Sequence, residues 1–204
     1  MTTTQQAVFA SLRPGLEALG YQHRKQGIYE FPLTDQLVGW LGLNRAKAGG
    51  ELRLHPVVGV RAIAVQNLVA ELRDSEASAH TPTVTQPLYK LISASVYRVW
   101  AFSEAHDSTE DLLEAIRGYA MPFMAGFTDV SSVIAALEQG MGQQVEYTLP
   151  AAHVVNGEPR RGIAAVNASV VALGDATDPA ANNLRAFAVR LTARAGRSAS
   201  QADS

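Results

Sequence analysis

Hydrophobic residues along the first 61 positions follow two periods, first that of a helix and then that of strands. Apolar side chains recur at spacings of three and four over 8–19, and Gly20 follows as a stop signal. Pro14 lies inside this stretch, so the helix either kinks there or restarts with Pro14 as its first residue. The basic and aromatic stretch 21–31, with a turn at Gly27, then predicts a β-hairpin.

The stretch ELRLHPVVGVR, residues 51–61, is an alternating strand with polar residues on one face. It follows a strand that begins at Leu37 and a turn pair at Gly49-Gly50. One face of the alternation is apolar and consists of Leu52, Leu54, Pro56, Val58 and Val60. The other face consists of Glu51, Arg53, His55, Val57, Gly59 and Arg61. Because proline has no N–H for the strand ladder, we expect an edge strand or a bulge at Pro56.

The middle of the chain mixes helical and strand patterns. The predicted elements are a helix over 63–73, a loop over 75–87, strands over 88–93 and 96–102, a helix from Asp107 or Ser108 to Met121-Pro122, and a helix over 128–140. After Pro150 the sequence becomes rich in alanine, and RRGIAAVNASVVALG and NNLRAFAVRLTARAG predict two more helices.

These elements predict an α+β fold, with a mainly antiparallel sheet of about five to six strands packed by helices and a C-terminal helical hairpin. We expect an α+β domain over 1–149 and the helical hairpin over 150–197, packed on the same core. The last residues, 198–204, are predicted to be a disordered tail.

Charge is distributed unevenly along the chain, although the formal net charge is only −2. Residues 103–146 carry one Lys/Arg and eight Asp/Glu, whereas the residues before and after this segment carry net charges of +3 and +2. A segment of net charge −7 disfavours contact with a nucleic-acid backbone. Glu110, Asp111 and Glu114 are either solvated residues at a helix start, where negative charge is favourable, or a surface for a basic partner.

No catalytic or cofactor motif is present. The chain has no cysteine and contains neither a phosphate-binding glycine loop nor a zincin or α/β-hydrolase signature. Its histidines are not spaced to place two imidazoles on one metal, and they are His23, His55, His80, His106 and His153. We therefore expect no metal site, no cofactor and no enzyme of a recognised type. Without a secretory signal or an apolar run of membrane length, we expect a soluble cytoplasmic protein.

The polar face of 51–61 is the main candidate site. Arg53, His55 and Arg61 share it, and basic residues of the preceding hairpin, with Trp40 and Tyr29, are expected nearby if the strands pair. Such a group suits an anionic ligand or an acidic partner surface. The other interpretation is the solvated face of an antiparallel sheet, which normally carries polar residues.

A resemblance to a known kind of protein lies in LEALGYQHRKQGIYEF, where a helix ends in Leu-Gly-Tyr and leads into a basic, aromatic strand pair. This stretch resembles the opening of uncharacterised bacterial proteins with a domain of unknown function, over residues 1–65. The resemblance implies a small α+β fold without established catalytic residues, and some such domains are immunity or accessory proteins that bind one partner.

Three functions follow as hypotheses. The first is a non-enzymatic protein-interaction module that binds a single partner through 103–146 or through the basic sheet face. The alternative is a small anionic-ligand-binding protein, or an enzyme of unrecognised type, with a pocket between sheet and helices lined by His55, Arg61 and Trp40. A weaker option is nucleic-acid binding through three arginines on one arc of the last helix, Arg190, Arg194 and Arg197.

Overall fold

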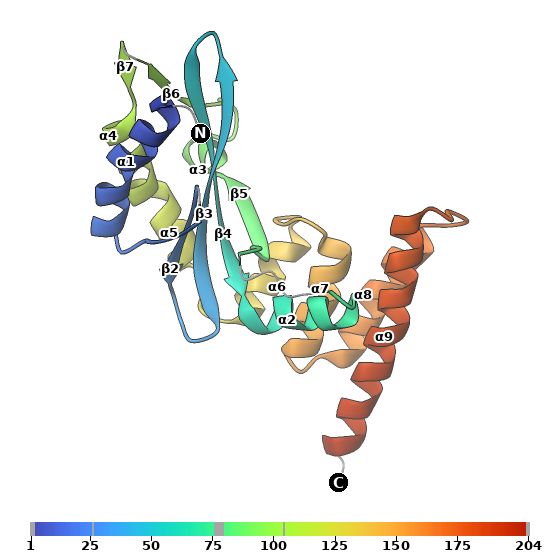
Figure 1. The fold of residues 1–204 in the computed structure, drawn as a ribbon. Helices are drawn as coiled ribbons and strands as arrows, with labels where there is room; N and C mark the ends of the chain where they lie inside the picture. The colour runs from blue at the N-terminus through green and yellow to red at the C-terminus, as the bar shows by residue number, and fades with distance from the viewer. Residues whose placement is uncertain (1–2, 26, 76–79, 104, 203–204) are drawn as a thin grey trace. The chain divides into compact units, whose positions relative to one another are not determined.

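The computed structural model describes residues 3–25, 27–75, 80–103 and 105–202, and the side chains of 3–4 and 197–202 lie outside this description (Figure 1). The chain divides into two units and passes between them three times. Unit 1 is Met1–Arg61 with Thr85–Thr128, and unit 2 is Ala62–Val84 with Asp129–Ser204.

Among the described residues, the sheet has seven strands, with the order β1-β2-β3-β4-β6-β7 and β5 also paired with β4. The strands are β1 (Gln22–Lys25), β2 (Ile28–Pro32), β3 (Leu37–Ala48), β4 (Glu51–Ala62), β5 (Val84–Pro87), β6 (Trp100–Ser103) and β7 (His106–Asp107). The pairs β1–β2, β2–β3, β4–β6 and β6–β7 are antiparallel. The predicted α+β class with a mainly antiparallel sheet is confirmed.

The long hairpin β3–β4 turns at Gly49 and Gly50, whose φ angles of 58° and 85° are in the left-handed region that favours glycine. The predicted alternation of β4 is confirmed, because all five apolar-face residues are buried. The prediction of an edge strand is wrong, since β4 pairs with β3 and also with β5 and β6. The residues of β4 that pair with β6 end at Leu54. Pro56, which has no N–H to donate, therefore lies beyond the part of β4 that pairs with β6.

Helices cover the apolar face of the sheet in unit 1. They are α1 (Thr3–Ala18), α4 (Thr109–Ala115) and α5 (Met121–Ala125), which lie on one side of the strands in Figure 1. Leu12 and Leu16 of α1 are fully buried. A Cβ added to Gly39 of β3 would lie 2.8 Å from Sδ of Met124, so α5 approaches the sheet closely there. Pro14 lies inside α1, which contradicts a restart at that residue.

Several predictions for the middle of the chain are wrong. Residues 88–92 form the short helix α3 (Leu88–Ile92) and not a strand, and the apolar spacing of 88, 91 and 92 is also helical. The strand predicted from Val96 begins only at Trp100. The helix that starts near Asp107 continues past Pro122, because a π-helical turn, η1 (Ile116–Ala120), changes the hydrogen-bond pattern before the proline.

Unit 2 contains five helices among its described residues. They are α2 (Ile63–Leu72), α6 (Val130–Glu138), α7 (Val145–Val155), α8 (Pro159–Ala172) and α9 (Pro179–Ala202). The predicted pair of C-terminal helices is confirmed as α8 and α9, and both pack on α7. A Cβ added to Gly162 of α8 would lie 2.7 Å from the carbonyl oxygen of Pro150, so glycine permits this close approach.

The predicted domain boundary after 149 falls inside α7, which sequence patterns did not reveal. The predicted disordered tail, 198–204, concerns residues whose side chains lie outside the description, and it stays a prediction. Within the described part of the chain, no single helix has both the length and the apolar composition to cross a membrane. The consecutive segments Thr109–Ala125 and Val130–Glu138 meet these criteria only when taken together.

Candidate functional site

Glu30 of β2 holds two arginines on the polar face of the sheet. Only 4% of Glu30 is exposed, and its side chain lies on the same face as Trp40, its direct neighbour across β2–β3. Arg24 donates from Nε to Oε2 of Glu30 at 2.8 Å, and Nη2 of Arg61 lies 3.5 Å from Oε1. Arg61 is therefore neutralised by a buried carboxylate within the protein, which leaves less of its charge for a ligand.

Trp40 fills space on this face instead of lining a cavity. Its side chain is buried, and a Cβ added to Gly42 would lie 2.2 Å from Cη2 of the indole. The indole Nε1 is buried and has no hydrogen-bond partner among the described residues. Tyr29, expected beside Trp40, pairs with Leu41 and so faces the opposite side of the sheet.

The three basic residues of β4, Arg53, His55 and Arg61, share a face but do not form one site. Arg53 and Arg61 are eight residues apart, which is about 26 Å along an extended strand. Arg53 instead lies 3.3 Å from Oε2 of Glu51 on its own strand. The polar face of β4 is thus divided into separate local interactions.

His55 belongs to an aromatic cluster that the sequence did not indicate. Its Nδ1 lies 2.7 Å from the hydroxyl of Tyr97, and the two rings stack at 26° with centroids 6.0 Å apart. Tyr89 of α3 meets Tyr97 edge to face at 4.9 Å. Tyr97 is nevertheless 64% exposed and its neighbour Val96 61%. We call His55, Tyr89, Val96 and Tyr97 the aromatic patch.

The predicted acidic residues of α4 differ in their environment. Asp111 accepts hydrogen bonds from Nη2 of Arg98 at 2.6 and 2.7 Å, and this guanidinium also lies over the Trp100 ring at 5.2 Å. Glu110 and Glu114 are exposed and have no ion-pair partner in the described part of unit 1. Two of the three predicted carboxylates thus remain available to solvent.

The acidic segment 103–146 is not one surface of a single unit. Residues 103–128 belong to unit 1 and 129–146 to unit 2. Asp129 caps α6 by accepting from the backbone N–H of Ser132 at 2.8 Å. Asp107 accepts from the N–H of Thr109. A hydrogen bond from the Thr109 side chain, followed by the one from this N–H, lowers the pKa of Asp107. Several of these carboxylates therefore serve local structure.

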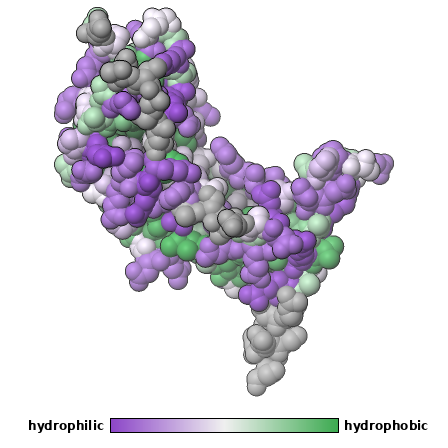
Figure 2. All heavy atoms as spheres, in the orientation of Figure 1, coloured by the Kyte–Doolittle hydropathy of each residue, from purple (hydrophilic) through white to green (hydrophobic). Residues whose placement is uncertain are grey.

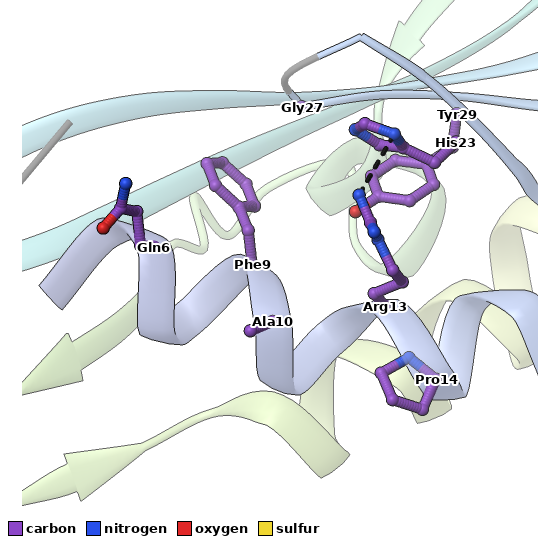
Figure 3. Close-up of a pocket in the computed structure, with 8 residues that line it drawn as sticks. All are labelled: Gln6, Phe9, Ala10, Arg13, Pro14, His23, Gly27 and Tyr29. Carbon is purple, nitrogen blue, oxygen red and sulfur yellow. Dashed lines mark hydrogen bonds between the residues drawn. The ribbon is translucent and has the colours of Figure 1, made fainter. Parts of the chain in front are cut away.

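A pocket of about 400 Å³ lies between α1 and the β1–β2 hairpin of unit 1 (Figure 3). Nη2 of Arg13 lies 3.2 Å from Nδ1 of His23, and the His23 ring meets the Tyr29 ring at a steep angle, with centroids 5.3 Å apart. Phe9 and Pro14 contribute apolar surface. Trp40, His55 and Arg61 do not line it, so the pocket expected around them is not the one found.

In unit 2, His153 is buried between two carboxylates. Its Nδ1 lies 2.8 Å from Oε2 of Glu158, and its Nε2 lies 3.8 Å from Oε1 of Glu138. Arg161 contacts both carboxylates. The hydrogen bond from His153 is the largest cause that lowers the pKa of Glu158. Among the described residues, His153 makes no hydrogen bond to a Ser or Thr hydroxyl. The network joins α6, α7 and α8.

The arginines of α9 named as a possible nucleic-acid surface make contacts within unit 2. Arg190 donates to the carbonyl oxygen of Leu72 at 2.9 Å, and Arg194 lies 3.8 Å from Oε1 of Glu71. The side chain of Arg197 lies outside the described residues. These contacts hold α9 against the end of α2.

A shallow apolar pocket lies between α8 and α9, and Figure 2 shows hydrophobic residues on the surface over α9. Val171 and Val189 are largely exposed. Arg185, which also lines the pocket, donates to the carbonyl oxygens of Gly174 and Ala176 in the loop that follows α8. Its guanidinium is therefore committed to holding the connection between α8 and α9.

Among the described residues, no group of three or more His, Asp or Glu side chains is placed to hold a metal ion. No protein-family model, curated protein or solved structure matches this chain. The resemblance of the N-terminal stretch therefore stays a prediction, and function must be argued from the residues themselves.

Proposed function

We propose that this protein is a non-enzymatic interaction module that binds a single protein partner through the aromatic patch. The observation that supports this is the exposure of Tyr97, at 64%, although its ring is held by His55 and Tyr89. An exposed aromatic side chain that is already oriented loses little conformational freedom on binding. Tyrosine is also among the residues that contribute most to protein interfaces.

The chemistry of the aromatic patch indicates what kind of surface its partner should have. Its centre is the Tyr97 ring with Val96, so the partner should offer an apolar recess. Within residues 88–99 the only charged residues are Lys90 and Arg98, and Arg98 is already bonded to Asp111. A carboxylate at the rim of the recess would therefore meet Lys90. An immunity-like or accessory role in the cytoplasm is the biological setting of this proposal, and a chain without cysteine suits that reducing compartment.

The polar face of β4 is a weaker basis for the same function. Its charges are paired internally, with Arg61 on Glu30 and Arg53 on Glu51. When a partner replaces one member of an exposed ion pair, the protein loses one interaction as it gains another, so the net gain in affinity is small. The aromatic patch, in contrast, offers apolar area that gains free energy when it is buried.

Site-specific photo-crosslinking in the native cell tests this proposal. A photoreactive amino acid replaces Val96, which is exposed, so the fold should tolerate it. We expect one protein adduct of defined mass, which disappears when Tyr97→Ala is added and persists when Tyr119→Ala is added. Tyr119 is an exposed tyrosine of η1 and provides the matched control. An adduct that survives Tyr97→Ala, or the absence of any adduct, would contradict the proposal.

A further inference from the structure

The pocket between α1 and the β1–β2 hairpin combines an apolar floor with one cation. Phe9 and Tyr29 are buried, and Phe9, Ala10 and Pro14 follow each other along α1 on the side of the pocket (Figure 3). The Arg13 side chain rises from the same helix toward His23. A cavity of about 400 Å³ is within the range of pockets that hold small ligands.

The chemistry of the two polar groups decides which of them donates the hydrogen bond. A guanidinium only donates, so Nδ1 of His23 must accept from Nη2 of Arg13. This contact adds no negative charge beside Arg13, whose guanidinium has no carboxylate partner in the described part of the chain.

An arginine that has no carboxylate partner among the described residues, beside an apolar floor, suits a particular kind of ligand. Arginine binds a carboxylate through two parallel hydrogen bonds, which is stronger and more specific than a neutral contact. Burial is the main cause that raises the pKa of Tyr29; Arg13 opposes this shift, and the charge of Glu17, one helical turn beyond Arg13, adds to it. A second negative charge on the ligand would be repelled by Glu17, so a single charge is favoured.

We propose that this pocket binds a small organic monocarboxylate with an apolar tail, with the carboxylate on Arg13 and the tail over Phe9 and Ala10. This binding site lies outside the aromatic patch and goes beyond the proposed protein interaction. It also differs from the pocket predicted around Trp40, His55 and Arg61.

Titration calorimetry of the full chain with octanoate and octanamide tests the proposal. The two probes share a tail and differ in charge. We expect saturable binding of octanoate at millimolar concentration or below, and binding of octanamide at least tenfold weaker. Arg13→Gln should weaken octanoate at least tenfold, because the charged hydrogen bonds are lost. Ala10→Leu, at an exposed position, should also weaken it by filling the floor.

Arg117→Gln is the matched control, since Arg117 is an exposed arginine of η1 that does not line the pocket. It should leave octanoate binding unchanged, as should Tyr97→Ala, which separates this test from that of the protein interaction. Circular dichroism verifies that each variant is folded. Equal binding of octanoate and octanamide, no effect of Arg13→Gln, or no saturable binding of octanoate would overturn the proposal.

Discussion

Replacing Glu30 by glutamine tests whether the buried carboxylate holds the polar face of the sheet together. The substitution keeps the size and shape of the side chain and removes its charge. Arg61, whose side chain is only 15% exposed, would then lack the carboxylate on which it lies. Arg24, at 42% exposed, could recover its interactions with water.

The expected loss of stability follows from these exposures. A hydrogen bond to a charged group contributes about 1.5–3 kcal/mol to the free energy of unfolding. Because Arg61 is only slightly exposed, its contact with Glu30 should fall within this range, and we take the lower value of about 1.5 kcal/mol. The contact with Arg24 is screened by solvent and adds about 0.5 kcal/mol. Glu30→Gln should therefore lower the free energy of unfolding by about 2 kcal/mol. With a urea dependence of about 2 kcal/mol per molar, the midpoint should fall by about 1 M.

Tryptophan fluorescence during urea unfolding is the assay, because the only two tryptophans, Trp40 and Trp100, are both buried in unit 1. Glu51→Gln is the control, since its ion pair with Arg53 is largely exposed and should contribute less than about 0.5 kcal/mol. If Glu30→Gln lowered the midpoint no more than this control, the reasoning about the buried carboxylate would be refuted.

Three further substitutions test other parts of the structure. Gly42→Ala should cost about 1–3 kcal/mol in urea unfolding and shift tryptophan emission, because the new methyl group displaces the Trp40 indole; an unchanged spectrum would contradict this packing. Tyr21→Phe should stabilise the fold by about 1 kcal/mol at neutral pH, because the buried hydroxyl has no partner among the described residues. Burial raises the pKa of Tyr21 in the folded state, so the contribution of this group to the free energy of unfolding is complete below pH 10.0 and is lost as the pH rises through the folded-state pKa. Tyr21→Phe should therefore lose less stability than the wild type at alkaline pH, and identical pH profiles of stability for the two proteins would refute this. Arg185→Met should cost about 1 kcal/mol by thermal unfolding, because the loop between α8 and α9 loses the donors to Gly174 and Ala176; an unchanged Tm would show that these hydrogen bonds contribute nothing.

Regular patterns in the sequence predicted most of the architecture. The alternation of β4 determined its buried face because side chains of a strand point to opposite sides in turn. The helix predicted over 128–140 is confirmed as α6, where the Asp129 cap and the positive φ of Gly140 are local signals that act within one helical turn. Local rules of this kind need no knowledge of the rest of the fold.

The errors arose where a short sequence fits two structures. Residues 88–92 suit a strand and a helix equally, and α7 was missed because Pro150 interrupts its pattern. The π-helical turn before Pro122 depends on the packing of its neighbours, so it left no signal in the sequence.

The candidate site was predicted less well than the fold. Placing Arg53 and Arg61 on one face was correct, but strand length alone separates them by about 26 Å. Tyr97 was interpreted as part of a strand over 96–102, although it is exposed on an irregular segment. Arg13 could have been noticed, because it follows Phe9 by four residues and so shares its side of the helix.

The affinity of the purified partner for this protein is the most direct test of the proposed interaction. Calorimetric titration would compare the wild type with Tyr97→Ala and Tyr119→Ala. We predict that Tyr97→Ala weakens binding at least tenfold, about 1.4 kcal/mol, whereas Tyr119→Ala leaves it unchanged. Equal affinities for all three proteins would contradict the central role of the aromatic patch.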